Sequence, residues 1–306
     1  MNKDKTLPIS ILIYNPRSGS TLDRDLWLGT TIDKICTHLK YAVVVHATTP
    51  DTSSSSILKS FLALEPELVV AAGGDGTIRH ILGSLSETKV DIPVGLVPFG
   101  TGNLLARNLK IFQEALFVDP LQSAIDVIAA RRTKRIDLGK MNGNYFCVAA
   151  GACPLSDAIL APTQEEKQNW GVLAYVGSMM QTVTSPPVTF RIDADGVKFE
   201  VKALGVIVTN VGDIGYATMS ERAQLDDGWL DLCIVTLEDF SDYMNMGFKV
   251  ASAMLATGAP FYIRKVRKVT IESPKGPVSA NIDGDHCGTT PMHIEVIPKA
   301  VNILCP

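Results

Sequence analysis

Short apolar runs alternate with segments of helical spacing in the first part of the chain, and this alternation constrains the fold more than any other feature. Helical segments are expected at residues 23–39, at residues 52–64 and after Thr77. Strands that alternate with helices predict a parallel sheet wound by βαβ crossovers. The four apolar runs are ISILIYNP from Ile9, YAVVVHA from Tyr41, ELVVAA from Glu67 and IPVGLV from Ile92.

Three of the predicted strands end in turns that combine glycine with hydroxyl or amide side chains. These turns are NPRSG from Asn15, GGDGT from Gly73 and GTGN from Gly100. Because parallel strands end at the same edge of a sheet, we expect the turns to lie where open α/β sheets bind ligands. Helix N-termini attract anions, and glycine removes the Cβ atom that would hold a phosphate away from backbone N–H groups. The turns therefore predict a phosphate site, although no Walker or G-x-G-x-x-G motif is present.

Asp75 is the unusual member of these turns. A carboxylate beside a bound polyphosphate is repulsive unless a cation or a sugar hydroxyl lies between them, and a magnesium ion carried by the nucleotide would meet that need. Thr77 can cap the following helix and also donate to a phosphate oxygen. The alternative is a plain tight turn in which Asp75 only caps the helix.

The pattern changes after residue 134, where many short β-like runs follow one another. Two helical candidates interrupt them, at residues 170–183 and 242–256. The sequence thus predicts an α/β protein, with an N-terminal parallel-sheet nucleotide-binding domain at residues 1–134 and a C-terminal β-sandwich domain with helical insertions at residues 135–306. This prediction also allows the C-terminal residues of the chain to pack against the first domain.

Composition excludes several classes of function. The formal net charge of −4 and the pI near 5.8 argue against general nucleic-acid binding, which usually needs a positive field. The six cysteines are dispersed without a C-x-x-C pair, so neither a zinc site nor a disulfide framework is predicted. The N-terminus shows no signal-type cleavage site, and no apolar run reaches the roughly 18 residues needed to span a bilayer. We expect a cytoplasmic protein with peripheral contact at the inner face of the membrane.

The three turns, in their order and separation, resemble the nucleotide-binding segments of the diacylglycerol kinase catalytic-domain family, which includes bacterial lipid kinases, sphingosine kinases and ceramide kinases. LDDGWLDL from Leu225 resembles the family's D-D-G-x-L-D element, and the segment from Ile282 to the end resembles its closing D-G-E segment. The resemblance covers essentially the whole chain. It implies an ATP-dependent lipid kinase that phosphorylates a diacylglycerol-like or sphingoid hydroxyl, with an α/β nucleotide domain followed by a β-sandwich domain.

The same resemblance implies which residues contact ATP. One of these residues is Thr48, although Thr49 could equally be the counterpart of the family's ATP-contacting residue. The implied ATP-binding residues are Asn15, Pro16, Arg17, Ser18, Gly19, Thr48, Gly73, Gly74, Asp75, Gly76, Thr77, Gly100, Thr101, Gly102 and Asn103.

The resemblance also implies a magnesium site and a proton acceptor. The magnesium ligands would be the Asp227 side chain and the backbone carbonyls of Gln224 and Trp229. Asp283 would accept the proton of the lipid hydroxyl, with Asp285 as its acidic neighbour; such base catalysis contributes about 10²- to 10⁴-fold. The alternative is that Asp283 and the following glycine only form a hairpin turn.

Three departures from the family pattern concern the residues near the acceptor and the proton acceptor more than the residues that bind ATP. Asp285 stands where the family usually has Glu, Arg79 and His80 stand where many members have Asn-Glu, and GACPLSDA from Gly151 is two residues longer than the family's segment. They permit a catalytically silent nucleotide- or lipid-binding protein as one alternative function. A second alternative is an NAD kinase, whose family shares GGDGT.

Basic residues cluster at 131–135 and 263–268. Either cluster could contact anionic lipid headgroups. A solvated hinge and a charged β-edge are the favoured alternatives. The identity of the lipid and the presence of a homodimer are left open by the sequence.

Overall fold

The computed structural model describes residues 7–16, 24–48, 60–100, 102–111, 119–152, 186–214, 220, 222–236 and 261–306. The chain divides into two compact units, the first formed by Met1–Ile136 with Lys299–Pro306 and the second by Asp137–Pro298. The chain leaves the first unit at Ile136, close to the predicted boundary after residue 134. Its last residues return to the first unit.

The first unit contains a parallel sheet, which confirms the predicted α/β fold. Its strand order is β2-β1-β3-β4, with the end of β16 beside β4, and every one of these pairs is parallel. Every residue of β3 and β4 is buried, as expected for continuous apolar runs that are covered on both faces. The strands are β1 (Ile9–Tyr14), β2 (Ala42–Ala47), β3 (Leu68–Gly73), β4 (Val94–Pro98) and β16 (Met292–Leu304).

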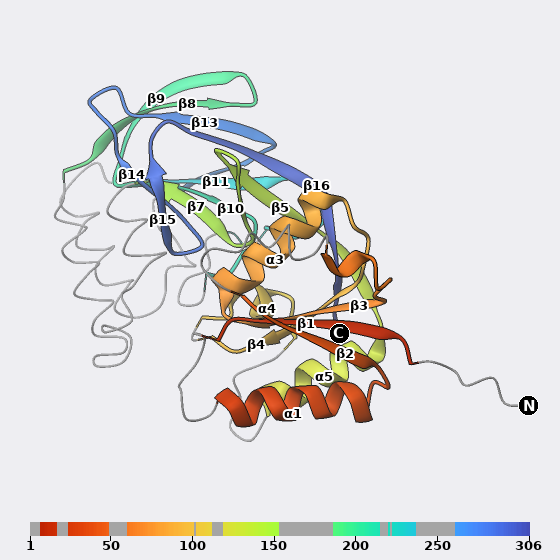
Figure 1. Ribbon diagram of the computed structural model, residues 1–306. Coiled ribbons are helices and arrows are strands. Elements are labelled where there is room, and N and C mark those ends of the chain that lie inside the picture. The colour runs from red at the N-terminus through yellow and green to blue at the C-terminus, as the bar shows by residue number, and fades with distance from the viewer. Residues whose placement is uncertain are drawn as a thin grey trace, which may run out of the picture. The chain divides into compact units, whose positions relative to one another are not determined.

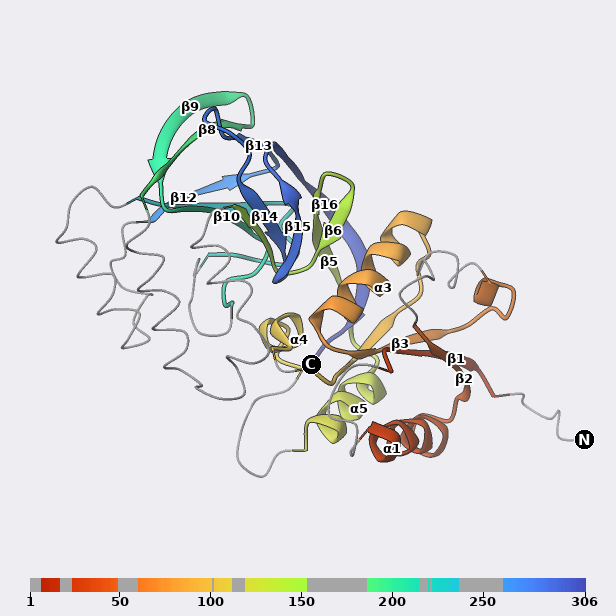
Figure 2. The same ribbon diagram turned by 60° about the vertical axis from the view of Figure 1, so that its left-hand side comes forward.

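Helices cover both faces of this sheet (Figures 1 and 2). Helix α3 lies on one face, and α1 and α5 lie side by side on the other. Asp119 caps α5 by accepting the Leu121 N–H at 2.9 Å. The helices are α1 (Arg24–Thr37), α3 (Asp75–Thr88), α4 (Leu104–Asn108) and α5 (Pro120–Ala130). The helices predicted at residues 170–183 and 242–256 lie outside the described residues, as does most of the one predicted at 52–64.

The second unit is a sandwich of two antiparallel sheets, as the sequence predicts. Buried side chains of both sheets form one core, for example Phe190 and Ile271 from one sheet with Val208 and Leu232 from the other. The first sheet joins β16, β13 (Lys268–Glu272), β8 (Val188–Ala194) and β9 (Val197–Ala203), with β5 (Thr133–Met141) beside β16 and β6 (Asn144–Phe146) beside β5. The second sheet has the order β12 (Phe261–Val266), β11 (Leu230–Val235), β10 (Gly205–Thr209), β7 (Ala149–Ala152), β14 (Ser279–Ile282) and β15 (Asp285–Thr289).

Candidate active site

The glycine-bearing turns of the first unit follow neighbouring strands at one edge of the parallel sheet. In the strand register Tyr14 lies opposite both Ala47 and Ala72, and Gly73 lies opposite Pro98. Backbone hydrogen bonds continue past the strand ends, because Thr48 N donates to Tyr14 O at 2.8 Å and Phe99 N donates to Gly73 O at 2.9 Å. The turns that the sequence singled out therefore lie next to one another.

This edge holds most of the residues predicted to bind the nucleotide. Arg17, Ser18, Gly19 and Thr101 lie outside the described residues, so the structure gives them no position. The predicted nucleotide-binding residues that do lie at these strand ends or in the first turn of the helix that follows are Asn15, Pro16, Thr48, Gly73, Gly74, Asp75, Gly76, Thr77, Gly100, Gly102 and Asn103.

Glycine is required here because two turns touch each other. A Cβ atom on Gly100 would lie 2.6 Å from the Cα atom of Gly74, and one on Gly102 would lie 2.8 Å from Oδ2 of Asp75. Real Cβ atoms essentially never come this close to other heavy atoms. The sequence argument assigned these glycines to the approach of a phosphate. The structure adds a second reason, which is the direct contact between the turn after β3 and the turn after β4.

Asn103 closes the second of these turns with its side chain. Its Oδ1 accepts the Gly100 N–H at 2.9 Å, and its Nδ2 donates to Gly100 O at 2.7 Å. The residue is 7% exposed and has a φ of 51°, a left-handed conformation that asparagine tolerates better than most residues. Both ends of the amide thus bond to the turn itself, so Asn103 shapes the turn.

In the second unit, Asp283 stands at the tip of the β14–β15 hairpin. Ile282 and Asp285 pair across the turn, and the φ values of Asp283 and Gly284 are 47° and 91°. Two positive φ values in a two-residue loop are the signature of a type I′ turn. The backbone of Asp283 and Gly284 therefore forms a hairpin turn, as the alternative interpretation of the sequence held. Asp285 is exposed and is the first residue of β15.

The Asp283 carboxylate is held by three backbone N–H groups at the start of β7. Oδ2 accepts from Cys147 N at 2.8 Å, and Oδ1 accepts from Val148 N and Ala149 N at 2.9 Å each. Successive backbone N–H groups that converge in this way form a nest for an anion. The side chain consequently fixes both its own orientation and the path of residues 147–149.

Asn210 and Asp137, which the sequence analysis missed, extend this arrangement. Nδ2 of Asn210 donates to Asp137 O at 2.9 Å and to Cys147 O at 3.2 Å. Asp137 in turn accepts the Gly228 N–H at 2.6 Å through Oδ2. Both residues are at most 1% exposed. The one sequence signal for each is a single polar residue within or at the end of an apolar run.

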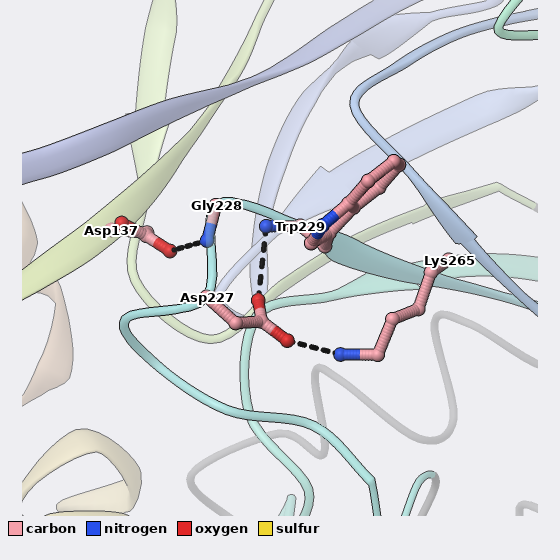
Figure 3. Close-up of polar contacts among 5 residues, drawn as sticks. All are labelled: Asp137, Asp227, Gly228, Trp229 and Lys265. Carbon is pink, nitrogen blue, oxygen red and sulfur yellow. Dashed lines mark hydrogen bonds and ion pairs between the residues drawn. The ribbon is translucent and has the colours of Figure 1, made fainter.

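The turn at residues 225–229 is held differently from the predicted magnesium site (Figure 3). Asp227 Oδ1 accepts the Trp229 N–H at 3.0 Å, and Oδ2 forms an ion pair with Nζ of Lys265. The Arg267 guanidinium lies 4.2 Å from the centre of the Trp229 ring. Gln224 is exposed.

Asp231 brings a second carboxylate to the same lysine. It lies directly opposite Lys265 in the β11–β12 pair and is 3% exposed. Burial raises the pKa of Asp231, while Lys265 and a hydrogen bond with Ser220 oppose that rise. Among the residues that the structure describes, no group of three or more His, Cys, Asp or Glu side chains is placed to hold a metal ion. Because the carboxylate is already paired with an ammonium group, Asp227 and its neighbours do not fit a bound magnesium ion.

Comparison with protein families matches both parts of the chain. Residues 10–141 match the family described as diacylglycerol kinase catalytic domain. Residues 155–305 match the family described as YegS C-terminal NAD kinase beta sandwich-like domain. Together the two matches span nearly all of the chain.

Curated relatives and solved structures agree with these matches. The chain is 26% identical to a diacylglycerol kinase of Bacillus subtilis (strain 168) over 297 residues, covering 96% of this chain and 95% of the relative. It is 25% identical to a diacylglycerol kinase of Staphylococcus saprophyticus over 300 residues, covering 96% and 94%. A crystal structure of a diacylglycerol kinase from Bacillus anthracis str. Sterne superimposes with a TM-score of 0.76 at 22% identity, covering 100% of this chain and 99% of that one. At this identity the superposition shows the shared fold.

Proposed function

The chain belongs to the diacylglycerol kinase catalytic-domain family, and from this premise we propose that it transfers the γ-phosphoryl group of ATP to a hydroxyl group of diacylglycerol. As a member of this family it is a lipid kinase. The observation that carries the ATP part of the proposal is the contact between the Gly74 and Gly100 turns at the ends of neighbouring parallel strands. Open α/β sheets bind their ligands at this edge.

The first unit would hold the triphosphate with its backbone. The N-terminus of α3 presents N–H groups and the positive end of the helix dipole directly after Gly74, which favours phosphate oxygens. Magnesium bound to ATP would neutralise the phosphate charge. Asp75, an acidic residue in the first turn of α3, would face that cation.

The second unit would supply the proton acceptor. We assign this role to Asp283, whose carboxylate is oriented by the N–H groups of residues 147–149. The lipid hydroxyl would lose its proton to this carboxylate as its oxygen attacks the γ-phosphorus, and ADP would leave. Asp285, exposed at the start of β15, would act as the acidic neighbour of Asp283.

A phosphate-transfer assay tests this proposal directly. The full chain is incubated with Mg²⁺, ATP labelled in the γ-phosphate, and diacylglycerol in mixed vesicles; labelled phosphatidic acid is the expected product. Sphingosine and NAD serve as parallel acceptors. Label in sphingosine alone would reassign the lipid class. Label in NAD alone, or no label even with a total lipid extract, would contradict the proposal and favour the NAD kinase or the silent binding protein.

We also propose that the second unit contacts the membrane through an exposed apolar surface, which we call the β9–β12 surface. It is the edge formed by β9 and β12, the edge strands of the two sheets, where Val197, Tyr262 and Ile263 are 48%, 50% and 45% exposed. Tyr262 and Ile263 are consecutive strand residues, so their side chains leave opposite faces of β12 at this edge. The rings of Phe199 and Tyr262 meet edge to face at 6.4 Å, which links β9 to β12. None of the helices that the structure describes is long and apolar enough to cross a bilayer.

The protein itself engages part of the basic clusters, so we base the membrane proposal on the apolar side chains. Arg131 donates to the Tyr41 hydroxyl at 2.8 Å, and Arg135 is paired with Asp91. Lys265 is paired with Asp227, and Arg267 lies over the ring of Trp229. These contacts favour the interpretation of a hinge and a charged β-edge.

Replacing Tyr262 and Ile263 together by serine is expected to weaken vesicle binding about tenfold or more. Burial of one large apolar side chain contributes roughly 1.5–3 kcal/mol, and about 1.4 kcal/mol changes an affinity tenfold. Flotation with vesicles that contain diacylglycerol measures the effect. Leu26→Ser on α1 is the matched control, since Leu26 is 75% exposed. Equal binding by the two variants would remove the β9–β12 surface as the membrane contact.

A further inference from the structure

Lys265 occupies the place where the turn at residues 225–229 would otherwise need a cation. Its Nζ is paired with Asp227 Oδ2, and Asp227 Oδ1 accepts the Trp229 N–H at 3.0 Å (Figure 3). Groups of the chain itself therefore engage both oxygens of the carboxylate. A divalent ion that bound the same carboxylate would have to displace the ammonium group.

A second carboxylate, that of Asp231, attracts the same lysine. Asp231 is the direct cross-strand partner of Lys265 in the β11–β12 pair, and it is 3% exposed. A buried carboxylate is costly without a counter-charge, and Lys265 attracts its charge. The Lys265 side chain is itself 36% exposed, and that of Asp227 is 19% exposed. One ammonium group thus attracts two acidic side chains, and Asp227 is its ion-pair partner.

The turn is also tied to the hairpin that carries Asp283. The Gly228 N–H donates to Asp137 Oδ2 at 2.6 Å, and Asn210 Nδ2 donates to both Asp137 O and Cys147 O. The Cys147 N–H then donates to Asp283. All of these residues belong to the second unit. Whatever neutralises Asp227 therefore stabilises the segment that orients Asp283.

We propose that Lys265 replaces a structural magnesium ion at this turn: its ammonium group supplies the positive charge, and the fold of the turn is independent of divalent cations. The inference concerns this chain's own lysine and does not rest on the identity of the lipid. It also does not concern the magnesium that accompanies ATP. Its test is therefore made without nucleotide and without an activity measurement.

The first test uses the unaltered full chain. Its thermal unfolding is followed in excess EDTA and in millimolar Mg²⁺, and the metal content of the EDTA-treated, dialysed protein is measured by elemental analysis. We expect the same Tm in both buffers and no stoichiometric magnesium. A Tm that rises with Mg²⁺, or one magnesium per chain after dialysis, would overturn the proposal.

The second test uses three variants. Lys265→Met removes the charge but keeps much of the side chain, Lys265→Arg keeps the charge, and Lys268→Met removes an exposed lysine three residues along the chain. In EDTA, Lys265→Met is expected to lower the Tm by about 2–4 °C, and Mg²⁺ is expected to recover part of this loss. The other two variants should behave like the unaltered chain. If Lys265→Met matches Lys268→Met in both buffers, the proposal is wrong; if it does not fold, the first test still decides.

Discussion

Gly100→Ala is expected to lower the affinity for ATP at least tenfold, or about 1.4 kcal/mol, and to destabilise the first unit. The added Cβ would lie 2.6 Å from Gly74 Cα and 3.0 Å from Asn103 Oδ1. The first of these is a backbone atom, which cannot rotate away as the end of a side chain can. Overpacking of this kind costs roughly 1–3 kcal/mol, and relief requires the turns after β3 and β4 to separate. Calorimetric titration with ATP measures the affinity, and thermal unfolding measures the stability.

Gly74→Ala is the matched control, because it adds the same methyl group on the other side of the same contact. Its Cβ would lie 3.5 Å from Gly100 Cα, which is ordinary van der Waals contact, and its φ of −83° suits any residue. If glycine serves only the contact between turns, Gly74→Ala keeps both stability and ATP affinity. If the phosphate needs a bare backbone at this turn, Gly74→Ala stays stable yet binds ATP weakly. A Gly100→Ala protein with normal stability and affinity would contradict the packing argument.

The parallel sheet could be predicted because its signals are local. Each strand, such as Leu68–Gly73, is an apolar run of fitting length that ends at a turn-forming residue, and the helices between the strands carry their own spacing. Parallel strands connected by crossovers then have little choice of arrangement, so the strand ends had to meet at one edge. The same reasoning predicted the two antiparallel sheets from the many short runs after residue 134.

The contacts that shape the site could not be predicted, because they join residues far apart in the chain. Asp283 bonds to N–H groups 134 to 136 positions away, and Lys265 meets Asp227 across 38 positions. The sequence pattern of the D-D-G turn is compatible with a cation of either kind, a metal ion or a lysine. Only the strand register, which sets Asp231 opposite Lys265, places the ammonium group there. Gly100 likewise carries no sign in the sequence that its neighbour is Gly74.

Replacing Asp283 is expected to have the largest effect on the second unit. Asp283→Ala removes the acceptor for the N–H groups of Cys147, Val148 and Ala149, which are residues at most 2% exposed. A buried polar group without a partner costs about 1–3 kcal/mol, so the three together should lower the free energy of unfolding by about 3 kcal/mol or more. Denaturant unfolding measures this loss. Stability within experimental error of the unaltered chain would show that the carboxylate does not hold residues 147–149.

Asp283→Asn separates the structural role from the catalytic one, because its side-chain oxygen still accepts two of the three N–H groups. The lost bond should cost roughly 1.5–3 kcal/mol, which leaves the protein folded at room temperature. If Asp283 accepts the proton of the lipid hydroxyl, kcat should fall about 10²- to 10⁴-fold while the KM for ATP changes little. Asp285→Asn is the comparison, since it removes the charge of the acidic neighbour at an exposed position and leaves the Asp283 carboxylate in place. Equal kcat for folded Asp283→Asn and the unaltered chain would leave Asp283 with a structural role alone, because a base that transfers the proton cannot be replaced by a neutral amide.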